Sequence, residues 1–427
     1  MSTPDATRNA HRTSAGRAGR REIRALTGLR IVAALWVVAF HFHFTPGETY
    51  TAAWQFLRPV IDAGALGVDL FFVLSGFVIT LTYLDSAGPR LTVGGTRSFL
   101  WARISRIWPV HVLVTTVFGG WLAYKATRVS DGYLAYQTIQ PQVDVQHYVE
   151  QLLMVQLWHR PTYQGASWVG PAWSLSAEWL AYVSFPVVVL VLWRLRNAPV
   201  LVTGALAVGC LLPAAYLSVA HGGLDFPFAW FLRIAGGFLA GALTCLTVRR
   251  LRTTPGADRA AGWCATLALL VIAAGLWWAD WRGQGTSGSA WVVAPLFPVL
   301  VGALALSTSG PARLLATRPM VHGGRISFAL YLVHIPVFEA FWTLMQWHPR
   351  MAPGTVVGTV ATPLVFASVF VLAHLVHRFV EEPAHRALRR WEPGPPVRTG
   401  GPVDVSETQE QALPQPRETA EPATERV

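Results

Sequence analysis

The chain has 427 residues, of which 52% are hydrophobic and only 13% are charged. A soluble domain carries roughly 25% charged residues, and here the apolar residues form long blocks with almost no charge, which is typical of membrane-spanning helices. The net charge of +11 does not indicate a nucleic-acid partner, because the basic residues lie in short links between these blocks. We expect an all-α, polytopic membrane protein in a lipid bilayer.

Three parts follow one another along the chain. Residues 1–23 are polar and basic and predict a disordered cytoplasmic tail, and residues 391–427, rich in Pro, Glu and Thr, predict a second one. Residues 24–390 between them predict a transmembrane domain of about ten helices, and Pro383 is expected to end the last of these. The apolar blocks are 28–46, 64–84, 99–124, 170–193, 199–219, 226–247, 262–280, 290–308, 326–347 and 355–379.

The distribution of arginine predicts the orientation of these spans. The N-terminal tail and every second link hold most of the arginines, whereas the alternate links hold few. Since basic residues favour the cytoplasmic side, both termini are expected in the cytoplasm, and the localisation that this predicts is the cell membrane. The largest external link, 125–169, contains a stretch at 149–154 that predicts a helix at the membrane surface.

The sequence lacks the familiar motifs of soluble enzymes. Its three cysteines form no CxxC pair and no Cys/His cluster, so neither a metal site nor a disulfide framework is expected. It has no Gly-rich phosphate loop, no HExxH helix and no GxSxG elbow. We therefore expect no bound cofactor, and nothing in the sequence indicates a particular oligomeric state.

Ionisable side chains inside a bilayer are costly, and each therefore needs an explanation. Arg30 opens the first block and His41 lies eleven residues later, which places both on one helical face about 16 Å apart. An arginine can bind a phosphate through paired hydrogen bonds, and a histidine can act as a general base near neutral pH. The alternative is that Arg30 only anchors the helix at the cytoplasmic surface and that His41 bonds to another helix.

Polar residues of the second block and the third-span link admit two interpretations each. Asp69 and Ser75 can line a substrate cavity or serve helix packing. Arg103 and Arg106 are neighbours on one helical face. They can hold the phosphates of a donor molecule, or they can form an ordinary basic pair at the membrane surface.

The fourth and ninth blocks hold further candidates. Glu178 stands among aromatic residues near the start of the fourth block, where it can orient the imidazole of His41, bind an acceptor hydroxyl or stabilise the helix start. Tyr331 and His334 share a helical face in the ninth block and predict either a polar seam between helices or part of a cavity. The other possible lining residues of such a cavity are Trp173 and Ser176.

Six short segments occur in a recognisable order. They are 26–41, which contains Arg30 and His41; 71–77; 103–109, which contains the arginine pair; 173–178, which ends in Glu178; 331–334; and 379–383. In this order they resemble the acyltransferase-3 family of integral membrane acyltransferases, and the resemblance covers about residues 24–390. Each segment alone is weakly specific, whereas six in the order of the family are strongly specific.

The resemblance implies an enzyme with ten core helices and with cytoplasmic acyl-CoA as co-substrate. It implies transfer of an acyl group, acetyl by default, to a hydroxyl of a carbohydrate, a glycolipid or a glycosylated natural product. It also implies that Arg30 and His41 match the key Arg and His of the family. The sequence departs from the family at Thr27 and Ile31, where Asp and Gly are usual.

The remaining matches complete a predicted mechanism. Arg103 and Arg106 match the basic pair of the family and are expected to bind the donor phosphates, together with Arg30. His41 then removes the proton of the acceptor hydroxyl, and Glu178, which matches the acidic residue of the family, orients His41 or the acceptor. The alternative function is a multi-span transporter or flippase of a lipid-linked sugar or small molecule, because buried Arg, His and Glu suit transport too; the absence of a repeated half argues against it.

Overall fold

The structure is a computed structural model that describes residues 22–46, 51–129, 132–224, 226–251, 254–282 and 288–392. All regular elements in these ranges are helical, and ten helical stretches are long and apolar enough to cross a membrane. The ten spans and the all-α class expected from the sequence are confirmed. The spans are Arg24–Phe42, Phe56–Ala87, Val93–Ala126, Gly170–Leu195, Val200–His221, Ala229–Arg250, Pro255–Trp281, Ser289–Leu306, Arg318–Trp347 and Val356–Arg389. The two predicted tails lie almost entirely outside the described residues.

Most spans contain one long α-helix, and the others are interrupted. The long helices are α2 (Arg24–Phe42), α4 (Leu66–Ala87), α5 (Val93–Ala126), α7 (Trp173–Leu195), α10 (Ala229–Arg250), α11 (Pro255–Trp281), α15 (Arg318–Trp347) and α16 (Val356–Val376). The shorter helices are α3 (Thr51–Asp62), α6 (Val145–Leu152), α8 (Val200–Gly209), α9 (Leu212–His221), α13 (Phe297–Leu306), α14 (Pro311–Leu315) and α17 (Glu382–Arg389). The 3₁₀ turns are η1 (Ala63–Ala65), η2 (Gly170–Ala172), η3 (Ser289–Leu296) and η4 (Pro349–Met351), and η5 (His377–Glu381) is a π-helical turn.

Three helices begin at threonine residues that cap them. The side-chain oxygens of Thr92, Thr254 and Thr355, which precede α5, α11 and α16, each accept a hydrogen bond from the backbone N–H three residues later. These bonds satisfy one of the donors that a helix start leaves unpaired. Pro255 follows Thr254 at the start of α11, where its missing N–H removes no helical hydrogen bond.

The last span does not end at Pro383, so that prediction is wrong. The helix continues from α16 through η5 into α17, and Pro383 lies in the first turn of α17. A proline is tolerated there because the first N–H groups of a helix have no intrahelical partner. The short helix predicted at 149–154 is present but begins and ends earlier, as α6, and the backbone of Met154 just beyond it has a φ of 57°.

His41 lies at the end of α2 but beside the middle of the longer helix α15. The sequence predicts a first span that continues to residue 46, whereas α2 has 19 residues and ends at Phe42, so His41 lies in its last turn. The same histidine contacts His334, which is near the middle of the 30-residue α15. His41 therefore keeps a position deep in the bundle although its own helix ends there. Because α2 is unbroken between Arg30 and His41, both lie on one helical face, as expected.

The helices α4 and α10 run parallel and pack very closely. Asp69 pairs with Arg233 and Asp85 pairs with Arg249, so the same offset along the chain holds at both ends of the contact. Glycines allow the approach: a Cβ atom at Gly241 would lie 1.9 Å from the carbonyl oxygen of Val73. Small residues at such positions let helix backbones approach each other in membranes.

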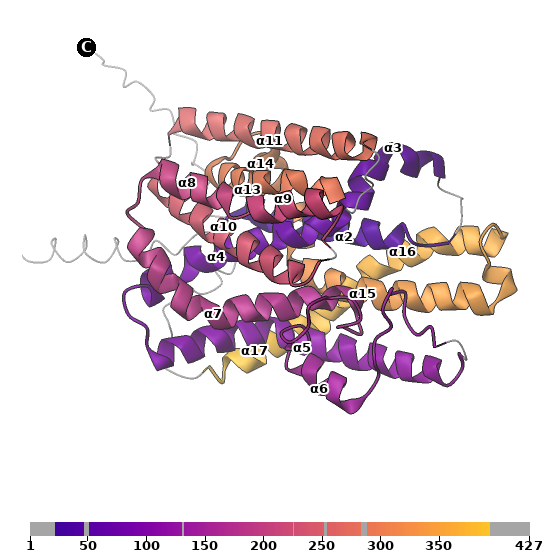
Figure 1. Cartoon of the computed structure of the whole chain (residues 1–427). Coiled ribbons are helices and arrows are strands. Elements are labelled where there is room, and N and C mark those ends of the chain that lie inside the picture. The colour runs from indigo at the N-terminus through magenta and orange to yellow at the C-terminus, as the bar shows by residue number, and fades with distance from the viewer. Residues whose placement is uncertain are drawn as a thin grey trace, which may run out of the picture. The chain divides into compact units, whose positions relative to one another are not determined.

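Figure 1 shows the spans lying alongside one another, with α11 along one edge of the bundle and α5 and α6 at the opposite edge. Two groups of buried apolar residues fill the interior. One group includes residues of α5, α7 and α15, and the other includes residues of α11 and α13. Residues of α2, α4 and α10 belong to both groups, so these three helices join the two halves of the bundle.

Because α4 and α10 are in such close contact, adding one methyl group between them is expected to lower the stability of the protein strongly. We expect Gly241→Ala to lower the stability of the purified protein by about 1–3 kcal/mol, because its Cβ would overlap backbone atoms of α4. The matched control is Gly120→Ala, about two turns before the end of α5, where no neighbouring heavy atom lies within 4 Å of the added Cβ. It should be neutral or stabilising by up to about 1 kcal/mol, since Gly disfavours helix. Thermal unfolding in detergent measures both, and equal melting temperatures would contradict the packing argument.

Candidate active site

Two histidines from helices far apart in the sequence meet inside the bundle. The Nδ1 atom of His41 on α2 and the Nε2 atom of His334 on α15 are 3.2 Å apart, and the ring centroids are 5.0 Å apart. His334 is fully buried, whereas His41 is partly exposed. The sequence predicts His41 as a catalytic base and His334 as cavity lining, but it does not predict that the two are hydrogen-bonded.

The hydrogen-bond partners of the two rings determine which of their nitrogens carry a proton. A backbone carbonyl only accepts, so the Nδ1 atom of His334, 3.2 Å from the Leu330 carbonyl, carries a proton and leaves Nε2 as an acceptor. The Nδ1 atom of His41 lies 2.9 Å from the Val37 carbonyl and therefore also carries a proton, which it shares with His334. In the neutral pair, Nε2 of His41 is the unprotonated nitrogen. No described residue hydrogen-bonds to that atom.

A tyrosine on α15 connects the histidine pair to α7. The ring centroid of Tyr331 lies 6.0 Å from that of His334. The Tyr331 hydroxyl is 2.7 Å from the hydroxyl of Ser174 and donates to the carbonyl of Pro171 at 2.9 Å. Tyr331 is thus held in place by the start of the fourth span, which agrees with the predicted polar seam between helices.

Three arginines line a second feature, a small cavity of about 40 Å³ near the beginnings of α2 and α5. Its polar lining residues are Arg30, Ser75, Arg103, Arg106, Glu178 and Tyr182. The Tyr182 hydroxyl donates to the carboxylate of Glu178 and is 3.2 Å from the hydroxyl of Ser75. The structure therefore brings the predicted basic pair, Arg30, Ser75 and Glu178 into one site.

The guanidinium groups of this arginine cavity are incompletely paired. Within the described part of the chain, none of Arg30, Arg103 and Arg106 forms an ion pair, and the buried Nε atoms of Arg30 and Arg103 have no hydrogen-bond partner. Arg103 contacts Tyr83 instead, by a 3.3 Å hydrogen bond to its hydroxyl and by stacking over its ring. Buried polar groups without partners are costly, so the cavity is suited to an anion that supplies the missing acceptors.

Aromatic rings connect the arginine cavity to the histidine pair. The guanidinium carbon of Arg30 lies 5.8 Å from the ring centroid of Phe71, and Phe71 lies 6.1 Å from Tyr331. Tyr331 in turn contacts His334. The arginine cavity and the histidine pair are therefore two separate sites that are connected by contacts between side chains of α2, α4 and α15.

Glu178 does not contact His41, so the expectation that it orients this imidazole is wrong. The partners of His41 are Val37 and His334, and Glu178 lies in the arginine cavity. The spacing along α7 explains the difference, because Glu178 and Tyr182 are four residues apart and share the face that points to the arginines. Tyr182 is a site residue that the sequence analysis missed, although this spacing was available to indicate it.

For Asp69, the structure agrees with helix packing, one of the two interpretations of the sequence, and not with the lining of a substrate cavity. Its carboxylate receives two hydrogen bonds from Arg233, at 3.0 and 2.8 Å, and one from the indole of Trp291 at 3.1 Å. Both members of this ion pair are almost fully buried, so Asp69 holds α4 against α10 and does not line an open cavity. Arg233 was missed by sequence reasoning, although a lone arginine within the apolar block 226–247 is a signal that a partner is needed.

Trp173 and Ser176 contact the link between α5 and α7 and do not form a free surface. Trp173 stacks on Tyr163 of this link with centroids 4.9 Å apart, and it also contacts the guanidinium of Arg233 at 4.8 Å and the ring of Phe72 at 6.2 Å. The hydroxyl of Ser176 accepts a hydrogen bond from the backbone N–H of Leu157 at 3.2 Å. Both side chains are buried in these contacts.

The departures from the family pattern lie at the α2–α15 contact. The Thr27 hydroxyl donates to Glu22 at 2.9 Å, and the same carboxylate lies 3.5 Å from Arg325 on α15. A carboxylate is therefore present next to position 27 although the usual Asp is absent. Ile31 packs against Gly323, where an added Cβ would meet the Ile31 side chain at 2.8 Å.

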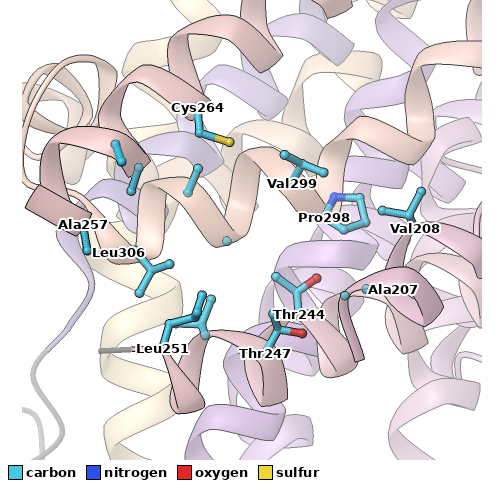
Figure 2. Close-up of a pocket in the computed structure, with 16 residues that line it drawn as sticks. Ala207, Val208, Thr244, Thr247, Leu251, Ala257, Cys264, Pro298, Val299 and Leu306 are labelled. Atoms are coloured by element: carbon cyan, nitrogen blue, oxygen red, sulfur yellow. The ribbon is translucent and has the colours of Figure 1, made fainter. Parts of the chain in front are cut away.

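A larger cavity of about 430 Å³ lies elsewhere, among α8, α10, α11 and α13 (Figure 2). Its wall is apolar apart from Thr244, Thr247 and Cys264. The two threonine hydroxyls donate to carbonyls of their own helix, at 2.7 and 3.0 Å. Because this wall presents no general base and no cation, the candidate chemistry belongs to the histidine pair and the arginine cavity.

The fold and site define a multi-pass membrane protein that holds a potential general base and an anion-binding cavity within one helical bundle. Residues 23–376 match the acyltransferase-3 family, described as an acyltransferase domain. The chain belongs to this family. It is an acyltransferase that transfers groups other than amino-acyl groups, and a transporter is not supported.

Two curated relatives extend over most of the chain. Acyltransferase MdmB from Streptomyces mycarofaciens is 29% identical over 408 residues, which cover 86% of this chain and 93% of that protein. Peptidoglycan O-acetyltransferase OatA from Listeria monocytogenes is 22% identical over 388 residues, which cover 87% of this chain but 57% of that protein. No solved structure matches the chain.

The two ion pairs between α4 and α10 are expected to differ in how much they contribute to stability. We expect Asp69→Ala to lower stability by about 3–5 kcal/mol, because it leaves the buried guanidinium of Arg233 without a counter-charge. The matched control is Asp85→Ala, which breaks the half-exposed pair with Arg249 on the same two helices. Its cost should be about 0–1 kcal/mol. Thermal unfolding in detergent tests this contrast, and similar shifts for both variants would show that burial does not determine the strength of the Asp69 pair.

Proposed function

We propose that this enzyme transfers an acyl group, acetyl by default, from acyl-CoA to a hydroxyl of a carbohydrate, a glycolipid or a glycosylated natural product. One arrangement carries the proposal: His41 offers an unprotonated Nε2 atom on the same helix face as an arginine cavity whose guanidinium groups form no ion pair in the described chain. A CoA-dependent transfer to an alcohol needs a base for the hydroxyl and an anion site for the donor phosphates.

The arginine cavity is proposed as the donor site. Arg103 and Arg106 bind phosphate groups of CoA, and Arg30 binds deeper, beside Phe71. Glu178 offsets part of the positive charge and holds the Tyr182 hydroxyl, so its proposed role is to position groups around the donor. The cavity is small, and donor binding therefore requires the side chains around it to move apart.

The sidedness of the reaction follows from the same residues. Arg30 and Arg103 lie near the helix starts of the first and third spans, both of which begin on the side of the N-terminus. Since basic residues favour the cytoplasmic side, we place the donor cavity towards the cytoplasm, both termini on the cytoplasmic side of the cell membrane, and the far ends of these helices towards the exterior.

The transfer itself is proposed to be direct. His41 Nε2 removes the proton of the acceptor hydroxyl while the oxygen attacks the thioester carbonyl carbon. The tetrahedral intermediate then collapses, the carbon–sulfur bond breaks, and His41 returns the proton to the CoA sulfur. The products are the ester and free CoA, and the imidazole returns to its starting state.

His334 is proposed to support this proton transfer. When His41 binds a second proton at Nε2, its Nδ1–H becomes a stronger donor, and the Nε2 atom of His334 accepts it at 3.2 Å. The hydrogen bond from His334 Nδ1 to Leu330 fixes the ring in the tautomer that can accept. A histidine partner takes the place of the carboxylate that often orients a catalytic imidazole.

The nature of the acceptor is proposed from the family and from one relative. The name of OatA states that it acetylates peptidoglycan, a glycan. A carbohydrate hydroxyl fits a base that is partly exposed and deep in the bundle. We extend this acceptor class to the present enzyme without specifying the sugar.

Substitution of the two histidines should separate their roles. We expect His41→Ala to lower kcat for acetyl transfer by about 10²–10⁴-fold, the usual contribution of a general base. His334→Ala should lower kcat less, by about 10-fold or more, and His334→Gln should recover part of the loss because its amide oxygen can accept the His41 proton. The KM for acetyl-CoA should stay nearly constant in all three. A His41→Ala protein that folds normally and keeps full transfer would contradict the mechanism.

The arginine cavity predicts a dependence on the phosphates of the donor. Arg103→Ala and Arg106→Ala should each raise the KM for acetyl-CoA by about 10-fold or more, because each removes a charge-assisted contact. With acetyl-N-acetylcysteamine, a thioester donor without phosphates, the same variants should differ little from wild type. Arg97→Ala provides the control, since this exposed arginine lies on the same helix but outside the cavity. Equal losses with both donors would show that the arginines do not bind phosphate.

A further inference from the structure

Aromatic side chains cover His41 on the side away from the arginine cavity. The ring centroids of Phe44 and His41 are 6.5 Å apart, those of Phe44 and Tyr136 are 5.7 Å apart, and those of Tyr136 and Trp342 are 4.9 Å apart. Trp342 is buried, whereas Tyr136 is 44% exposed. These rings form a continuous path from the molecular surface to the candidate base.

The path exists because α2 is short. α2 ends at Phe42, whereas α15 continues beyond His334 to Trp347. Eight residues, or about 12 Å of helix, separate His334 from Trp342. The space beside this part of α15 is occupied by Phe44 and by residues of the external link around Tyr136.

The link around Tyr136 is firmly held. The backbone N–H of Tyr136 donates to the buried carboxylate of Glu339 on α15. The side chain of Gln140 accepts hydrogen bonds from the N–H groups of Leu134 and Ala135, at 2.9 and 3.0 Å. The Trp342 indole donates to Thr45 at 3.0 Å, which fixes the chain just after α2. Such preorganisation reduces the entropy lost when a ligand binds.

The exposed ring of Tyr136 has the properties of a sugar-binding surface. One face of a pyranose ring consists of C–H groups, which pack well on the electron-rich face of an aromatic ring. The Tyr136 hydroxyl has no hydrogen-bond partner among the described residues, so it is available for a polar group at the edge of the sugar. Lipid contact alone, as in the aromatic belts of membrane proteins, would not require a rigid link next to the candidate base.

We propose that Tyr136, supported by Trp342 and continued inwards by Phe44, is a stacking platform for a sugar ring of the acceptor. The platform contacts a sugar ring of the acceptor and not the hydroxyl that reacts. It thereby sets the direction from which that hydroxyl approaches Nε2 of His41. Donor and acceptor then enter from opposite ends of the bundle. This inference rests on the proposed transfer to a carbohydrate.

The test compares a sugar acceptor with an acceptor that has no ring. Purified protein receives labelled acetyl-CoA with chitotriose, an oligomer of N-acetylglucosamine, or with glycerol. We expect Tyr136→Ala to lower the chitotriose-to-glycerol ratio of kcat/KM about tenfold, mainly through the KM for chitotriose. Tyr136→Phe, which keeps the ring, should preserve most of that ratio. Tyr216→Ala, at an exposed tyrosine on α9, is the control and should behave as wild type.

The outcomes distinguish the platform from the proposed function. An unchanged ratio in Tyr136→Ala overturns the platform, as does transfer to glycerol that depends on His41 without any transfer to chitotriose. In both cases the acyl transfer proposal stands. If neither acceptor is acetylated and acetyl-CoA is not hydrolysed in a way that depends on His41, the proposed function fails, and the platform fails with it.

Discussion

The cost of burying polar groups among apolar helices governs the organisation of this protein. Every imidazole, guanidinium or carboxylate inside the bundle must find a partner or remain accessible to a ligand. Asp69 and Arg233 satisfy each other almost completely, and His334 is satisfied by Leu330 and His41. Among the described residues, the Nε atoms of Arg30 and Arg103 in the arginine cavity and the Nε2 atom of His41 have no hydrogen-bond partner. The candidate site therefore contains basic groups and an imidazole nitrogen that the fold leaves available to a ligand.

Close packing around α4 decides which of the buried charged groups are paired with one another. Glycines on α10 let its backbone contact that of α4, and the parallel arrangement brings Asp69 and Asp85 opposite Arg233 and Arg249. With its acidic residues used in these pairs, α4 presents Phe71 and Ser75 to the site. The ion pairs with α10 thus lie on one side of α4, and the arginine cavity lies on another side.

The proposed acyl transfer has to bring together a charged, water-soluble donor and an alcohol. The distance of eleven residues between Arg30 and His41 on one helix supplies a spacing of about 16 Å between an anion site and a base. Phe71 and Tyr331 fill the region between the two sites with aromatic rings. The short α2 then gives the base an approach from the other end, along Phe44 and Tyr136. In the proposed mechanism, one face of α2 therefore lies next to both substrates.

The sequence by itself determined the all-α class, the ten spans, the shared face of Arg30 and His41 and the family, because these depend on local hydropathy, helical periodicity and short motifs. Only the tertiary structure decided the partners. In the structure, His41 is hydrogen-bonded to His334, Glu178 lies in the arginine cavity and not beside the imidazole, and Asp69 is paired with Arg233. Residues 164 or 293 positions apart meet through the packing of whole helices, and helical periodicity fixes the face of a side chain but not which neighbouring helix that face will meet.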